Sequence, residues 1–81
     1  MTTITVIIAP VDNWQDKINE MLSWSHTVGV LDISFNEDRD LARDHVMDDI
    51  LDFVFPDSSI AQRFKERFAN HNITMIETNQ Q

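Results

Sequence analysis

The sequence predicts a small α/β (α+β) two-layer sandwich, in which three helices cover a three-stranded sheet in the order βαβααβ. Residues 3–9 form a β-branched apolar run, which is typical of a central strand that is buried on both faces. Residues 38–54 separate apolar from acidic side chains over about four helical turns. The single glycine and the two prolines fall between such segments, where turns are expected.

The first strand is followed by a predicted helix. Asp12, with Gln15 three residues later, forms a loose capping box at its start. Trp24 falls at the border of the helix's apolar face, about 100° from its centre. Gly29 marks the next turn, and residues 28–35 are predicted to form a second strand. The face that should cover the sheet holds Trp14, Ile18, Met21, Leu22 and Ser25.

Two structures compete for residues 38–54. A helix would gather apolar residues on one side and the aspartates on the other. Alternatively, residues 50–55 could form a strand, which would give a ferredoxin-like βαββαβ fold. We prefer the helix because its partition extends over more residues. Its apolar side would hold Ala42, Val46, Met47, Ile50, Phe53 and Val54.

The last third of the chain predicts a helix and a short strand. Pro56 ends the preceding element, and Asp57 or Ser58 caps a helix. Residues 73–77 then form the final strand, and residues 78–81 are expected to be a flexible polar tail. Residues 1–77 therefore make a single domain. The apolar face of this helix is Ile60, Ala61, Phe64 and Phe68.

Composition narrows the class of protein. The chain has 81 residues, 42% of them hydrophobic, which favours one folded domain over disorder. It has no cysteine, so disulfides and thiolate metal sites are excluded. The N-terminal residues lack a signal-peptide pattern, and no apolar run reaches membrane-spanning length. We therefore expect a cytoplasmic protein that makes no membrane contact.

The negative charge is concentrated in the middle of the chain. The net charge is −8. Residues 32–57 carry nine acids against two arginines, and so hold −7 of it. Such a segment should be repelled by nucleic acid and steered toward basic surfaces. The nine acids are Asp32, Glu37, Asp38, Asp40, Asp44, Asp48, Asp49, Asp52 and Asp57.

Signatures of catalysis and metal binding are weak. One glycine excludes the glycine-rich phosphate loops. Asn36, Asp38 and Asp40 match the first spacings of a calcium loop, but Leu41 and Met47 replace its glycine and final glutamate. We therefore expect a protein that is not an enzyme, with no catalytic residue, cofactor or specific metal.

The most specific pattern is an aspartate at every fourth position. On a helix, Asp40, Asp44, Asp48 and Asp52 would form one stripe, although like charges at this spacing repel each other. Many acidic helix faces are merely hydrated, but a stripe kept despite repulsion can be read by a partner. The predicted partner-binding residues are these four aspartates with Glu37 and Asp49 in support, and Trp24 as an anchor.

These observations predict a non-enzymatic acidic binding protein. It would act as an inhibitor or nucleic-acid-mimicking decoy on the basic surface of a nucleic-acid-binding protein or nuclease complex, without binding nucleic acid itself. Small acidic chains of this kind are typical of phages and mobile elements. The alternative is a structural or scaffolding subunit that homodimerises or docks through an apolar and aromatic surface around Trp24, Leu51 and Phe55.

Overall fold

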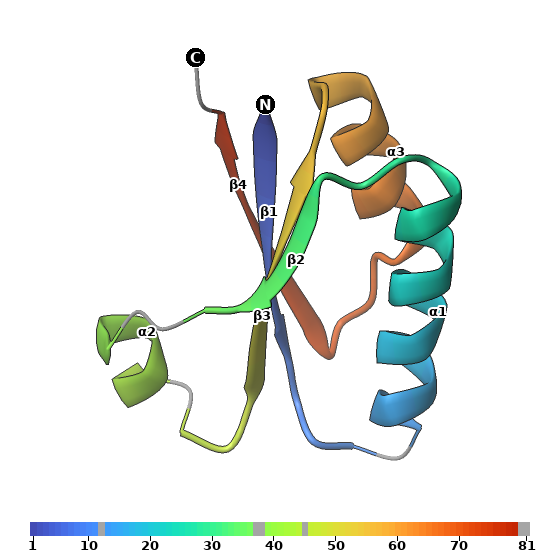
Figure 1. The fold of residues 1–81 in the computed structure, drawn as a ribbon. Coiled ribbons are helices and arrows are strands. Elements are labelled where there is room, and N and C mark those ends of the chain that lie inside the picture. Colours follow the sequence, from blue (N-terminus) through green and yellow to red (C-terminus); the bar gives the residue numbers. More distant parts are fainter. Residues whose placement is uncertain (12, 37–38, 45, 80–81) are drawn as a thin grey trace.

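A single antiparallel sheet of four strands organises the chain, in the order β2-β3-β1-β4. The structure is a computed structural model that describes residues 1–11, 13–36, 39–44 and 46–79. Figure 1 shows α1 and α3 on one side of the sheet and the short α2 on the other. The elements are β1 (Thr2–Ile8), α1 (Trp14–Thr27), β2 (Asp32–Phe35), α2 (Arg39–Asp44), β3 (Asp49–Phe55), α3 (Ser58–Arg67) and β4 (Ile73–Asn79).

The predicted helix over residues 38–54 is wrong in its second half, and the sheet has four strands rather than three. Asp49–Phe55 forms β3, which pairs with β1 on one side and β2 on the other. The element order agrees with the ferredoxin-like βαββαβ alternative, with α2 added between β2 and β3. Backbone pairing with two neighbours outweighs the local helical pattern, because β3 satisfies both of its edges in this way.

The alternation of side chains along β3 agrees with a strand. Leu51, Phe53 and Phe55 are buried on the helix side, while Asp52 and Val54 on the other face are half-buried. Val46 and Met47, which the helical interpretation placed on the buried side, are each 77% exposed. The separation of apolar from acidic residues over positions 38–54 therefore comes from two different elements, α2 and β3.

The core lies between the sheet and the helix pair α1 and α3. Rings of α3 meet rings of β3, with centroids 5.0 Å apart for Phe53 and Phe64 and 5.2 Å for Phe55 and Phe64. Each of these rings contributes about 1.5–3 kcal/mol through burial alone. The buried hydrophobic cluster consists of Ile4, Val6, Ile8, Met21, Leu51, Phe53, Phe55, Ala61, Phe64 and Phe68.

The ends of the helices follow local chemistry. Asp57 caps α3, as one of the two predicted candidates, and accepts a hydrogen bond of 2.9 Å from the Ile60 amide. Asn13 precedes α1 in a left-handed conformation with φ of 69° and makes no side-chain cap. The predicted cap Asp12 lies outside the described residues. After α1 the chain turns at Gly29, whose φ of 82° suits a residue without a side chain.

Two strand boundaries differ from the sequence prediction by two or more residues, while those of β1 shift by one. The second strand is only Asp32–Phe35, because residues 28–30 form the turn and loop after α1. β4 runs to Asn79, beyond the predicted end at residue 77. The extension pairs Thr2 with Asn79, and the Thr2 hydroxyl donates to Asn79 Oδ1 at 2.9 Å.

Candidate interaction surface

The four regularly spaced aspartates do not share one helix face. Asp40 and Asp44 lie on α2, Asp48 lies in the turn before β3, and Asp52 lies within β3. Asp49 is also in β3, but an odd number of positions from Asp52, so the two side chains leave opposite faces of the sheet. The predicted continuous stripe is therefore wrong as geometry, while the role of these residues in partner binding stays a prediction. Glu37 lies outside the described residues.

Asp52 is held in the middle of the sheet face that α1 and α3 leave open. Its Oδ1 accepts a hydrogen bond of 2.6 Å from the Thr5 hydroxyl of β1. The Asn36 side-chain amide, just after β2, donates to both carboxylate oxygens at 3.1 Å. Hydrogen bonds to an ionised acceptor are the stronger kind. Asp52 therefore ties β1, β3 and the end of β2 together, which is a structural task.

The helix that was expected to supply the charge is neutral by itself. α2 contains Arg39 and Arg43 as well as Asp40 and Asp44. Arg43 lies 3.8 Å from Asp40, and both side chains are largely exposed, so this ion pair contributes little. The negative excess therefore comes from acids on either side of α2, including Asp48 and Asp49.

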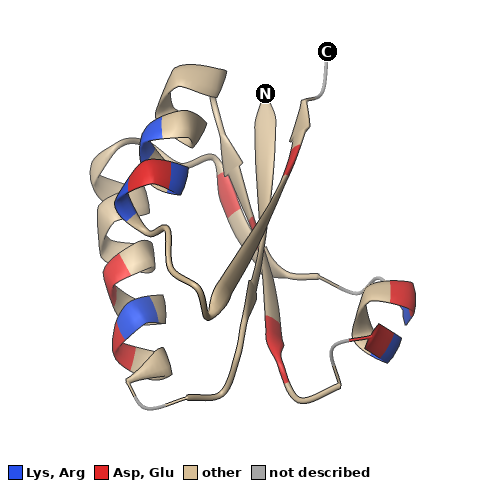
Figure 2. Cartoon of the chain, turned by 180° about the vertical axis from the view of Figure 1, so that it is seen from behind, with Lys and Arg blue, Asp and Glu red and all other residues tan. Residues whose placement is uncertain are grey.

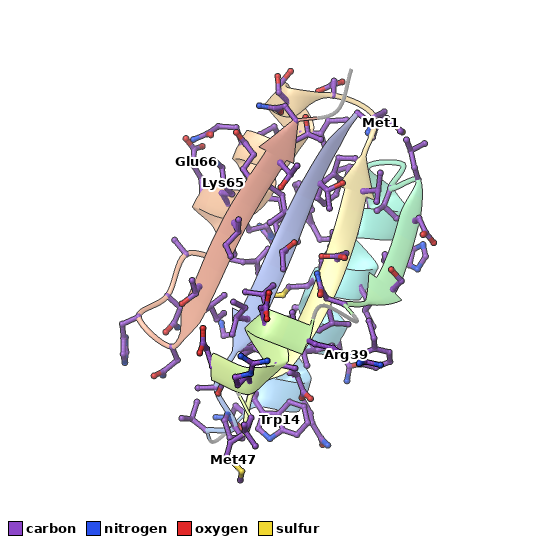
Figure 3. The ribbon with its side chains drawn as sticks, turned by 90° about the vertical axis from the view of Figure 1, so that its left-hand side faces the viewer. Met1, Trp14, Arg39, Met47, Lys65 and Glu66 are labelled. Atoms are coloured by element: carbon purple, nitrogen blue, oxygen red, sulfur yellow. The ribbon has the colours of Figure 1, made fainter. Side chains whose placement is uncertain are left out.

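The loop between α2 and β3 carries the most exposed large hydrophobic residues among those described. Val46 and Met47 are each 77% exposed, and we call them the apolar tip. Figure 3 shows Met47 at one end of the molecule, with its side chain directed away from the body. Large apolar side chains left in water beside charged residues are typical of contact surfaces.

Four of the six basic residues lie on the two helices across the sheet from α2, and the other two, Arg39 and Arg43, lie on α2. Figure 2 shows lysine and arginine on α3 and α1, which lie across the sheet from α2. α3 contributes Arg63, Lys65 and Arg67, and Lys65 Nζ is 3.1 Å from a carboxylate oxygen of Glu77 on β4. α3 is therefore a basic helix, although Asp57 of the acid-rich segment caps its N-terminus and Asp49 lines the groove beside α1.

The apolar patch predicted around Trp24, Leu51 and Phe55 does not exist. Phe55 is fully buried, and Leu51 is 6% exposed. Trp24 is half-buried, with its ring centroid 6.4 Å from that of Phe55 and 6.0 Å from that of Phe68. The Arg63 guanidinium lies 6.0 Å from the Trp24 ring centroid. Trp24 therefore closes one end of the core, and its role as a partner anchor stays a prediction.

A groove between α1 and β2 is the feature that sequence reasoning missed. It encloses about 550 Å³, and its apolar lining comes from both elements. Among the described residues that line it, Asp49 alone is charged. The available signal was the spacing of Trp14, Ile18 and Leu22, which we assigned entirely to covering the sheet. The lining residues are Trp14, Gln15, Ile18, Asn19, Leu22, Ile33, Ser34, Phe35, Asp49 and Leu51.

The described residues contain no group of three or more histidine, aspartate or glutamate side chains placed to hold a metal ion. Within the same part of the chain, every helix falls short of the length and hydropathy needed to cross a bilayer. Neither the protein-family models nor the curated proteins that were compared with this chain contain a match to it.

Proposed function

We propose that this chain is a non-enzymatic binding protein that docks its β2–α2–β3 side on a basic surface of a nucleic-acid-handling protein and thereby acts as an inhibitor or decoy. The observation that carries the proposal is the coincidence of two features in one segment. Residues 32–57 hold a net charge of −7, and the apolar tip within them is 77% exposed at both positions. Acids around exposed apolar residues match the polar rim and apolar centre of protein interfaces.

The two features would act at different stages of binding. The acidic segment steers a basic partner into encounter and disfavours acidic or nucleic-acid competitors. Val46 and Met47 are then buried against the partner, and this burial slows dissociation of the complex. Asp48 and Asp49 contribute to the negative excess, while Asp40 and Asp44 offset the two arginines of α2. Asp52 adds to the field of the segment, but its hydrogen bonds to Thr5 and Asn36 leave it less available for contact.

A second candidate is the structural subunit that docks mainly through apolar contact, and the exposure of Val46 and Met47 favours it. Ionic strength separates the two functions. Exposed charges more than about 10 Å apart are largely screened at about 0.1 M salt. An interface steered by carboxylates weakens as salt rises, whereas an apolar interface does not.

The test is capture of partners from lysate on immobilised protein at low and high salt. The acidic variant is Asp40→Asn/Asp44→Asn/Asp48→Asn. Its matched control is Asp16→Asn/Glu20→Gln/Glu66→Gln, which removes as much charge from exposed positions on α1 and α3. We expect a basic partner that is retained by wild type and the control, released by salt and lost with the acidic variant. Equal capture by the two variants would reject the acidic surface as the binding site.

The apolar tip is tested in the same way with Val46→Ser/Met47→Ser. Both residues are exposed, so the fold should tolerate these changes. The proposed function expects this variant to lose the partner even at low salt. A partner that resists salt but requires the tip would instead establish the structural-subunit function.

A further inference from the structure

The groove between α1 and β2 exists because the two elements differ in length. α1 has 14 residues and rises about 21 Å. β2 has four residues and spans about 13 Å. The apolar face of α1 therefore extends past the strand that should cover it. Trp14, Ile18 and Leu22 form one wall, and Ile33 and Phe35 form the other. Phe35 is 73% exposed at the rim.

β2 is also an edge of the sheet, with β3 on its inner side only. The Asn36 amide donates to the Ile50 carbonyl at 3.1 Å, and the register pairs Ser34 with Asp52. In an antiparallel ladder the hydrogen-bonded residues alternate. The backbone groups of Ile33 and Phe35 therefore face away from β3, while their side chains enter the groove. One strand thus offers backbone pairing and an apolar pocket together.

We infer that an extended segment of a basic partner protein adds to the free edge of β2 as a fifth strand and places apolar side chains in this groove. The pattern of β2 sets the chemistry of that segment. On the groove side it presents Ile33 and Phe35, and on the open face Asp32 and Ser34, with Asp52 one strand further in. The matching strand is apolar at alternate positions and carries lysine or arginine between them.

Charge complementarity decides which occupant the groove takes. On the open face, where the lysine or arginine side chains of the added strand would lie, β2 presents Asp32, and the chain carries a net charge of −8. Among the described residues that line the groove, the charged one is Asp49. If a second copy of the chain paired with β2, its negative charges, including its own Asp32, would lie across the junction from those of the first copy. β4 forms the other edge, but the Lys65–Glu77 ion pair covers its helix side. A basic segment at β2 is therefore the favoured occupant.

The short edge also decides where affinity comes from. Four residues allow few backbone pairs, so most of the binding free energy must come from apolar side chains entering the groove. This inference rests on the proposed function, because it specifies how the basic partner is held. Its experiment therefore uses a defined peptide, which does not require the natural partner.

The probe is a short end-blocked peptide that alternates lysine and valine, titrated into the isotope-labelled full chain and followed by NMR. The matched control peptide alternates glutamate and valine. We expect the lysine peptide to shift the amides of Ile33 and Phe35 and the methyl groups of Ile18 and Leu22, and to bind at least about tenfold more tightly than the control. Shifts confined to β4 or α3, or equal binding of both peptides, would overturn the inference.

Two variants separate the edge from the groove. Phe35→Pro removes an outward-facing amide, a change that edge strands tolerate, together with the Phe35 ring that lines the groove. Phe35→Ala is therefore its control, because it removes the ring and keeps the amide. Ile18→Ala shortens a half-buried groove side chain and leaves the edge intact. Phe35→Pro, compared with Phe35→Ala, and Ile18→Ala should each weaken binding of the lysine peptide by about tenfold. Gln62→Ala, at an exposed position of α3, should leave the peptide affinity unchanged. If Phe35→Pro unfolds, Ile18→Ala alone decides, and wild-type affinity for the peptide would refute the inference.

The two proposals can fail separately. If the natural partner is lost with the apolar-tip variant but retained by Ile18→Ala and Phe35→Pro, the groove inference is wrong and the proposed function stands. If wild type captures no basic partner at low salt, the proposed function fails, and the peptide titration still decides whether the groove accepts a basic strand.

Discussion

Asp52→Ala tests the placement of the acidic residues, because the structure gives this aspartate a task that Asp44 does not have. Asp52 accepts hydrogen bonds from Thr5 at 2.6 Å and from Asn36 at 3.1 Å. Asp44 is exposed near the end of α2. If both aspartates lay on one acidic helix, their replacement by alanine would change the free energy of unfolding equally. The placement of Asp44 on α2 and of Asp52 within β3 predicts a large difference.

The magnitude follows from the burial of the partners. Thr5 is 7% exposed, and a buried hydrogen bond to a charged group contributes about 1.5–3 kcal/mol. The Asn36 amide is only half-buried, so solvent reduces its contribution to about 0.5 kcal/mol. Asp52→Ala should therefore lower the free energy of unfolding by about 2–3 kcal/mol, whereas exposed sites such as Asp44 change it by about 0.5 kcal/mol or less.

The assay is urea unfolding followed by tryptophan fluorescence, with thermal melting as a second measurement. For a domain of this size each kcal/mol lowers Tm by about 4–8 °C, so Asp52→Ala should lose at least about 8 °C. Thr5→Val removes the hydroxyl at nearly constant volume. In a double-mutant cycle it should couple to Asp52→Ala by about 1 kcal/mol or more. Equal small effects of Asp52→Ala and Asp44→Ala, with no coupling to Thr5, would refute the placement of Asp52 in β3.

Three further predictions concern the helices. Among the described residues the buried Ser25 hydroxyl has no hydrogen-bond partner, so Ser25→Ala should raise the free energy of unfolding by about 1 kcal/mol in a urea titration; a decrease would mean that the hydroxyl is satisfied. The Ile60 amide, and then the Ser59 side chain, hold the pKa of Asp57 below its ordinary value of 3.8, so its stabilising effect is present above that value and is lost as pH falls through the lower folded pKa. The stability difference between wild type and Asp57→Ala should therefore shrink below about pH 4, and a difference that grows on acidification would contradict this cap. Trp24→Ala removes ring contacts with Phe55 and Phe68 and should cost about 2–3 kcal/mol, below the range for fully buried aromatics; an unchanged melting temperature would contradict its packing in the core.

Local patterns were sufficient for the elements whose sequence permits one interpretation. The β-branched run of β1, the apolar faces of α1 and α3 and the cap of α3 predict those elements within a few residues. Residues 50–55 permit two interpretations, because the apolar residues there fit both a helical and a strand period. Pairing with β1, about 50 positions earlier in the chain, decides between them. Local periodicity carries no information about such non-local hydrogen bonds.

The same limit applies to the candidate surface. The spacing of the aspartates predicted one stripe, but the partner of Asp52 is a threonine in β1, and Asp49 leaves the other face of the same strand. The concentration of negative charge in residues 32–57 was predictable because it depends only on the positions of the charged residues along the sequence. The exposure of Val46 and Met47 was not, because it follows from where α2 ends and β3 begins.

The measurement that tests the proposed surface most directly is site-specific photo-crosslinking in lysate. A photoreactive side chain replaces Met47 in the apolar tip, or Glu66 on α3 as the matched control; both sites are exposed. The account predicts one crosslinked basic protein from position 47, absent from position 66 and reduced by high salt. A crosslink from position 66 alone, or products from position 47 that ignore salt and the Asp40→Asn/Asp44→Asn/Asp48→Asn substitutions, would contradict it.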